Sequence, residues 1–82
     1  MTRDQAKEYI RGALAAVLAK DVGDLDDKTN LIADGVVDSL DLMNFLLHLE
    51  RTIGKKLKSV DESFTDFRVG TLADLVVSEV GA

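Results

Sequence analysis

The chain has 82 residues, 46% hydrophobic and 30% charged, a composition typical of a globular domain rather than a disordered segment. It contains no cysteine, which excludes disulfides, thiolate catalysis and thiolate metal ligands. The net charge is −5, and residues 21–50 alone sum to −7, with eight acids against Lys28. Such a field disfavours nucleic acid and favours a basic protein partner.

No run approaches the roughly 18 consecutive apolar residues of a membrane span. The first ten residues carry acids and lack the apolar stretch of a signal peptide. We therefore expect a single domain over residues 1–82, monomeric and cytoplasmic.

The first predicted helix runs from about Arg3 to about Ala19. Thr2 and Gln5 stand at the two ends of an S/T-x-x-E/Q capping box. Apolar residues then follow at helical spacing along one stripe: Tyr9, Ile10, Ala13, Leu14, Val17 and Leu18.

Residues 20–37 are predicted to form a long loop, because they hold two glycines, five aspartates and no sustained period. Four apolar side chains are expected to pin this loop to the core: Leu25, Leu31, Ile32 and Val36. Part of the loop superficially resembles a calcium-binding EF-hand. That loop needs an oxygen ligand at its fifth position, a glycine at its sixth and a glutamate at its twelfth, and this chain has Lys28, Thr29 and Gly35 there. We therefore expect no metal site.

The second predicted helix begins at Asp38 as N-cap, with Asp41 three residues later, and runs to about Thr52. Gly54 is expected to end it in the left-handed conformation. Its inward face is expected to comprise Leu42, Phe45, Leu46, Leu49 and Ile53. A second apolar stripe of Leu40, Met43 and Leu47, with Asn44, His48 and Arg51 near it, indicates a helix that is buried on two sides or docks a partner.

The remaining chain is predicted to form a connector over residues 55–60, a short helix over Asp61–Phe67 and a last helix. That helix is expected to have Thr71 at its N-cap and Asp74 three residues on. Its inward residues are expected to be Leu72, Leu75, Val76 and Val80. The predicted fold is all-α: a small four-helix bundle of three main helices and one short helix, with a long first loop.

Intrinsic hydrolase chemistry is not expected. Ser39 and His48 would lie about 13–14 Å apart along one helix, whereas a nucleophile and its base need about 3 Å. The basic cluster of Lys55, Lys56 and Lys58 fits solvated charge after a helix end better than a phosphate site.

Ser39 has two interpretations. It fits the first turn of a helix as a small polar residue. It also fits an attachment point, because a phosphodiester is favoured at a helix N-terminus and Asp38 already supplies the cap.

The run D-S-L-D-L-M-N-F-L-L-H-L-E, residues 38–50, resembles the D-S-L motif and second helix of carrier proteins, both acyl carriers and their peptidyl and aminoacyl relatives. The D-G-V-V lead-in, the E-S-F-T-D-F segment and the final T-L-A-D-L-V extend the resemblance over nearly the whole chain.

The resemblance implies that Ser39, between Asp38 and Leu40, carries a 4′-phosphopantetheine arm. A separate phosphopantetheinyl transferase would transfer the arm from coenzyme A, and its thiol would hold cargo as a thioester. The magnesium and base of that reaction would belong to the transferase. The chain would then be a non-enzymatic carrier that presents cargo to a loading ligase or transferase and to downstream biosynthetic enzymes. The docking residues would be Asp41, Met43, Asn44, Leu47, Glu50 and Arg51.

Two departures bear on the cargo. Asn44 and Arg51 stand where the fatty-acid carriers have acids, and the D-G-V-V lead-in is more similar to that of aminoacyl and other stand-alone peptidyl-type carriers. These features favour an amino acid or a specialised acyl cargo. The alternative is a small acidic helical adaptor that binds a basic partner and is never modified.

Overall fold

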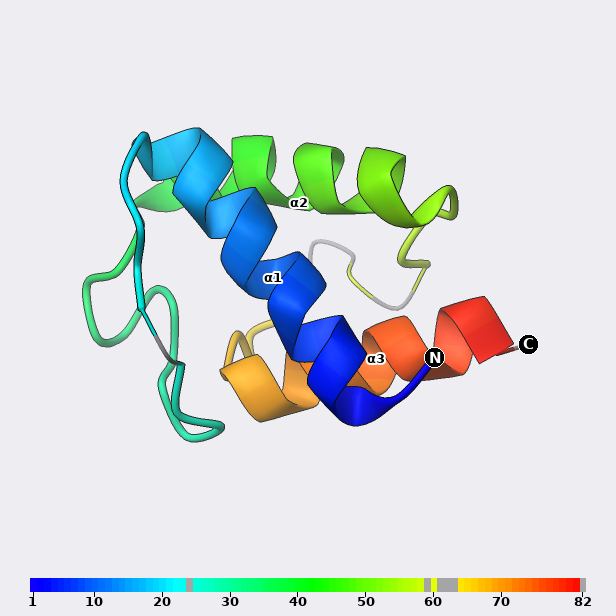
Figure 1. The fold of residues 1–82 in the computed structure, drawn as a ribbon. Coiled ribbons are helices and arrows are strands. Elements are labelled where there is room, and N and C mark those ends of the chain that lie inside the picture. Colours follow the sequence, from blue (N-terminus) through cyan, green and yellow to red (C-terminus); the bar gives the residue numbers. More distant parts are fainter. Residues whose placement is uncertain (24, 59, 61–63, 82) are drawn as a thin grey trace.

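The structure is a computed structural model, and it describes residues 1–23, 25–58, 60 and 64–81. Its three helices are α1 (Arg3–Leu18), α2 (Ser39–Ile53) and α3 (Val69–Gly81). In Figure 1, α1 crosses diagonally between α2 and α3 and packs against both. The predicted all-α class is therefore confirmed.

The ends of α1 and α2 follow the sequence prediction. The Gln5 N–H donates to Thr2 Oγ1 at 3.1 Å and the Thr2 N–H donates to Gln5 Oε1 at 2.9 Å, which completes the capping box. Helix α2 ends at Gly54, which adopts φ 74° as expected for a left-handed C-cap. Helix α1 ends at Ala19, which takes the same conformation without a glycine.

One hydrophobic cluster joins all three helices to the loops. Phe45 and Leu49 of α2, Ile10 and Leu14 of α1 and Leu72 of α3 are fully buried in it. The predicted inward faces are thus confirmed at their centres. The other buried members are Ala6, Ala13, Leu31, Val37, Leu42, Leu57, Val69, Ala73 and Val76. Tyr9, which was expected on the α1 stripe, is 40% exposed.

The long first loop pairs with the segment that enters α3. The Leu31 N–H donates to the Phe67 carbonyl at 3.0 Å. In the other direction, the Val69 N–H donates to the Thr29 carbonyl and the Gly70 N–H to the Asp27 backbone carbonyl, both at 2.9 Å. We call these contacts the loop junction. They satisfy backbone groups that a free loop would leave to water.

The apolar anchors of this loop differ in part from the prediction. Leu31 is fully buried, and Leu25 and Val36 pack partly buried against the core. Ile32 was expected to join them, but it is exposed, and Val37 is buried instead. The chain doubles back over residues 31–37, and the Val37 N–H donates to the Leu31 carbonyl at 2.9 Å. That turn directs Leu31 and Val37 inward and leaves Ile32 outside.

Ion pairs hold the loop junction from the side of α1. Lys7 Nζ lies 2.7 Å from Asp27 Oδ1, and Arg3 pairs with both Asp27 and Asp74, the latter at 2.8 Å. The hydrogen bond from Lys7, with that from Arg3, keeps the pKa of the Asp27 carboxyl below its ordinary value. One carboxylate therefore links the loop to α1, and Arg3 extends the link to α3.

The predicted fourth helix is wrong over the part of its span that the structure describes. Residues 64–67 are not helical, whereas positions 61–63 lie outside the described residues. An isolated antiparallel bridge joins Asn30 to Arg68, and Phe67 uses its carbonyl to accept the Leu31 N–H. Pairing with the first loop thus replaces the helical hydrogen bonds of this segment.

The predicted start of the last helix is also wrong. Helix α3 begins at Val69, two residues before Thr71, so Thr71 is not the N-cap. The Thr71 hydroxyl donates instead to Asp66 Oδ2 at 3.0 Å. Asp66 also binds the Arg68 guanidinium, which holds the pKa of the Asp66 carboxyl far below its usual range. In the described part of the chain, no helix is long and apolar enough to cross a membrane.

Gly70 and Gly12 provide a matched test of the loop junction. A Cβ on Gly70 would lie 2.7 Å from Arg3 Nη2 and 3.2 Å from the Asp27 carbonyl oxygen, whereas a Cβ on Gly12 would meet nothing within 4 Å. We expect Gly70→Ala to destabilise the domain by about 1 kcal/mol or more through overpacking. Gly12→Ala should stabilise it by about 0.5–1 kcal/mol through helix propensity. Urea unfolding of both variants measures the difference; equal stabilisation by the two would show that the junction is not tightly packed.

Candidate functional site

The site lies where the first loop becomes α2. Asp38 is the N-cap, with extended backbone, and the Asp41 N–H donates to its Oδ1 at 2.8 Å. The Leu42 N–H donates to the Asp38 carbonyl at 2.9 Å, which starts the helical ladder. The predicted N-cap at Asp38 is therefore confirmed, and it fixes the direction in which the first helical residue leaves the turn. The described residues show no return bond from the Asp38 N–H to the Asp41 carboxylate, so the predicted acidic capping box is only half formed.

Ser39 is that first helical residue, and its side chain is exposed. Asp38 caps the helix, so the Ser39 hydroxyl is not needed for capping. No hydrogen bond to that hydroxyl occurs among the described residues. An exposed hydroxyl at a helix N-terminus can take a phosphodiester there, close to the unpaired N–H groups and the positive end of the helix dipole.

The turn before Ser39 is fixed by a short hydrogen-bond network. Asn30 Oδ1 accepts the Ile32 and Ala33 N–H groups, and the Asn30 N–H donates to Asp34 Oδ2 at 2.9 Å. Gly35 then adopts φ 74°, a conformation that favours glycine. The lead-in is thus anchored at the loop junction, and it places Ser39 at a defined point.

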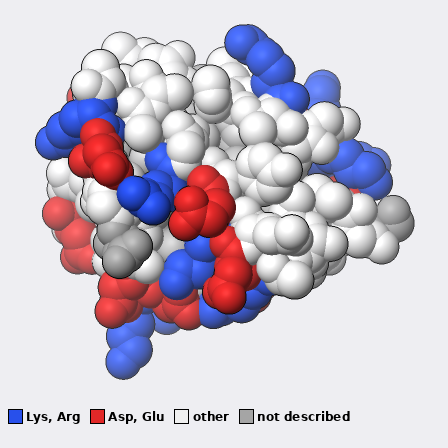
Figure 2. Space-filling view, viewed as in Figure 1, with Lys and Arg blue, Asp and Glu red and all other residues white. Residues whose placement is uncertain are grey.

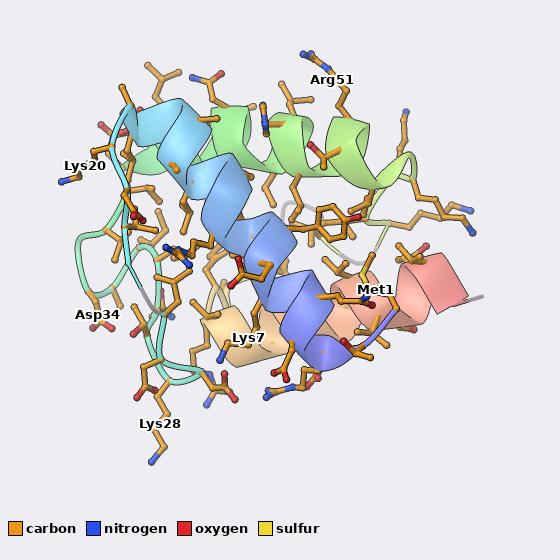
Figure 3. The ribbon with its side chains drawn as sticks, in the orientation of Figure 1. Met1, Lys7, Lys20, Lys28, Asp34 and Arg51 are labelled. Atoms are coloured by element: carbon orange, nitrogen blue, oxygen red, sulfur yellow. The ribbon has the colours of Figure 1, made fainter. Side chains whose placement is uncertain are left out.

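The second apolar stripe of α2 faces solvent. Leu40 is 70% exposed, Met43 64% and Leu47 58%. The first loop does not cover them. We keep the name apolar stripe for these three residues. In Figure 3, the side of α2 that points away from α1 carries a row of side chains, among them Arg51.

The other predicted docking residues are divided between solvent and the fold. Asn44 and Arg51 are exposed, and Asp41 is half-buried. Glu50 is also half-buried, and its Oε2 accepts the Leu57 N–H at 2.8 Å. Glu50 therefore holds the connector after α2, which leaves its carboxylate less available to a partner than the sequence suggested.

The remaining serines offer poorer settings. Ser78 is exposed on α3, far along the helix from its N-terminus. Ser59 and Ser63 lie outside the described residues. Among the described residues, no three side chains of histidine, aspartate or glutamate are grouped so that they could hold a metal ion.

No pattern in the sequence singles out Asp27 or Gly70, yet both position the start of α2 through the loop junction. Asp27 was one aspartate among several in an acidic loop. Its partners Arg3 and Lys7 are more than 19 positions away, so no local spacing indicates the pair. Gly70 gave no signal either, because it fell between the predicted short helix and the predicted N-cap Thr71.

Comparison with protein families gives one match. The family described as "Phosphopantetheine attachment site" matches residues 8–76. No curated protein and no solved structure matches significantly. The chain therefore belongs to the family of phosphopantetheine-binding carrier domains, which are non-catalytic.

The prosthetic group of this family is 4′-phosphopantetheine, and the partners that it implies are a phosphopantetheinyl transferase and biosynthetic enzymes. When bound, the group supplies the thiol that this cysteine-free chain lacks. The described residues fit it at the start of α2, where a hydroxyl lies exposed beside a completed cap.

Proposed function

We propose that Ser39 is the attachment point of the phosphopantetheine arm and that the protein carries thioester cargo between partner enzymes. The observation that carries this proposal is the exposed Ser39 at the first position of α2, directly after Asp38. Ser78 is the other described serine, and it falls outside the matched residues 8–76. Asp38 and Leu40 complete the motif as cap and first stripe residue.

Mass spectrometry after modification tests this assignment. Wild type, Ser39→Ala and Ser78→Ala are incubated with coenzyme A, magnesium and a phosphopantetheinyl transferase, and intact masses are recorded. We expect one adduct on wild type and on Ser78→Ala, and none on Ser39→Ala. An adduct on Ser39→Ala would overturn the site. An unmodified wild type would favour the unmodified adaptor instead.

We further propose that the exposed face of α2 docks the partner enzymes, acting from a monomer. Met43 and Leu47 would supply apolar contact, while Asp41, Asn44 and Arg51 would select the partner by charge and hydrogen bonding. Glu50 would contribute at the edge of this face, since Leu57 already engages one of its oxygens. An apolar side chain buried at an interface contributes up to about 1.5–3 kcal/mol.

Truncation of Met43 separates docking from folding. Met43 is mostly exposed, so Met43→Ala should change thermal stability little, yet lower the kcat/KM of the transferase by about tenfold if about 1.4 kcal/mol of contact is lost. Leu49→Ala on the buried face is the control and should cost about 2–5 kcal/mol of stability. A Met43→Ala protein that melts as early as Leu49→Ala but loads at the wild-type rate contradicts the docking role.

We propose that the cargo is short or polar, such as an amino acid. Phe45 is fully buried, and the Phe64 and Phe67 rings pack edge to face with centroids 5.1 Å apart. Phe64 and Phe67 pack partly buried against the core, and native cores have few voids, so we expect little room there to shelter a long acyl chain. A chain left in water would lack the burial worth about 0.8 kcal/mol per CH₂. A cargo-loading ligase that activates an amino acid would then be the first partner.

Melting temperatures of loaded protein test the cargo. The protein carrying alanine and the protein carrying an eight-carbon acyl group should melt within about 2 °C of the unloaded form, because neither cargo enters the core. A 100-residue domain gains about 4–8 °C for each kcal/mol of stabilisation, so burial of the acyl chain would be obvious. A large rise with the acyl group alone would refute a short or polar cargo.

A further inference from the structure

The segment of residues 30–37, which we call the lead-in, is held at its ends by burial but not in its middle. Leu31 and Val37 are buried, whereas residues 32–35 between them are exposed. Charged side chains line the left edge of Figure 2, over the first loop, as expected for a segment in contact with water. Packing therefore fixes the two ends of the lead-in, and hydrogen bonds must order its middle.

Asn30 supplies most of these hydrogen bonds. Its Oδ1 accepts the Ile32 N–H at 3.1 Å and the Ala33 N–H at 2.9 Å. Its own N–H donates to Asp34 Oδ2 at 2.9 Å, and its carbonyl accepts the Asp34 N–H, also at 2.9 Å. The Gly35 N–H then donates to the Ile32 carbonyl at 3.0 Å. One residue thus takes part in most of the bonds that close this turn.

The pattern is that of a capped helix start placed in a loop. The Asn30 side chain accepts the N–H groups two and three residues further on, as an N-cap does, and the Asp34 side chain returns to the Asn30 N–H. In α1 the return comes from the third residue, Gln5, whereas here it comes from the fourth. Asparagine is among the best residues for this role and alanine is among the poorest.

The backbone of Asn30 connects this turn to the loop junction. An antiparallel bridge joins Asn30 to Arg68, and on either side of it the Thr29 carbonyl and the Leu31 N–H bind the segment that enters α3. Successive backbone groups of an extended segment point to opposite sides, so the N–H and carbonyl of Asn30 are left for the turn. Asn30 is therefore the residue at which the anchored part of the loop becomes the lead-in.

We propose that Asn30 is a positioning residue for the modification of Ser39, because its side chain holds the lead-in in the conformation that the transferase binds. This inference rests on the proposed function, in which Ser39 receives the arm. The lead-in ends two residues before Ser39, so an enzyme that reaches the hydroxyl must also fit against the lead-in. Loss of a side-chain cap shifts its local equilibrium by about two- to thirtyfold. A transferase that finds an ordered lead-in in only a fraction of the molecules binds the carrier correspondingly more weakly.

Modification kinetics, followed by intact mass, test this role. Asn30→Ala removes the acceptor, whereas Asn30→Thr restores one, since a threonine hydroxyl also caps and threonine suits an extended segment. Asn30→Ala should raise the KM of the transferase for the unmodified carrier about fivefold and leave kcat within about twofold, because saturating carrier supplies enough of the ordered form. Asn30→Thr should recover most of the wild-type KM.

Val76→Ala is the control for stability. It truncates a fully buried side chain of α3, so it should lower the melting temperature at least as much as Asn30→Ala does, yet keep the wild-type KM. All variants are assayed at a temperature at which circular dichroism shows them folded. An unchanged KM for Asn30→Ala, or a KM that follows the melting temperature across the variants, would overturn the proposal.

NMR relaxation measures the order of the lead-in without any enzyme. The heteronuclear NOE of the backbone amides of residues 32–35 should fall in Asn30→Ala and recover in Asn30→Thr, while that of Leu49 in the core stays constant. Unchanged values in Asn30→Ala would refute the ordering role. A wild type that the transferase never modifies would refute the attachment site as well, whereas normal modification with an unchanged KM would refute the positioning role alone.

Discussion

The loop junction is the constraint on which the rest of the structure depends. Between α1 and α2 no described residue is helical, and the proposed attachment point, Ser39, follows directly after this segment. Backbone hydrogen bonds from residues 69 and 70 to the loop, with the Leu31 N–H bound by Phe67, fix the middle of that segment. Asp27 then ties it to Arg3 and Lys7. Without this junction, the entropy of a long free loop would spread the start of α2 over many positions.

Local chemistry explains which parts of this fold the sequence could predict. Caps are local, so Thr2 and Asp38 were assigned correctly from a few neighbouring residues. The apolar period of α2 predicted the buried face, which is confirmed at Leu42, Phe45 and Leu49, but it left open whether the second stripe is buried or exposed. The start of α3 was missed because the segment before it pairs with residues about 40 positions earlier. Such non-local pairing overrides local propensity and leaves no periodic signal.

The candidate site shows the same division between local and distant causes. Ser39 could be singled out because its motif is continuous in the sequence and its cap is adjacent. Glu50 was assigned to docking from its position on the helix, but its carboxylate holds the Leu57 N–H. A helical wheel gives the direction of a side chain, not the backbone group that returns to meet it. Asp27 was missed because the cations that pair with its carboxylate, Arg3 and Lys7, come from α1, far away in the sequence.

The two faces of α2 therefore carry different requirements. The inner face, with Phe45 and Leu49 fully buried, must be apolar to hold a small domain together. The outer face is free of that requirement, since its most exposed residues contribute little to the core. Apolar side chains on this outer face stay in contact with water, so they gain no free energy of burial when the domain folds. Their exposure next to Ser39 supports the docking role proposed for this face. A carrier without chemistry of its own can be selective only through such a surface.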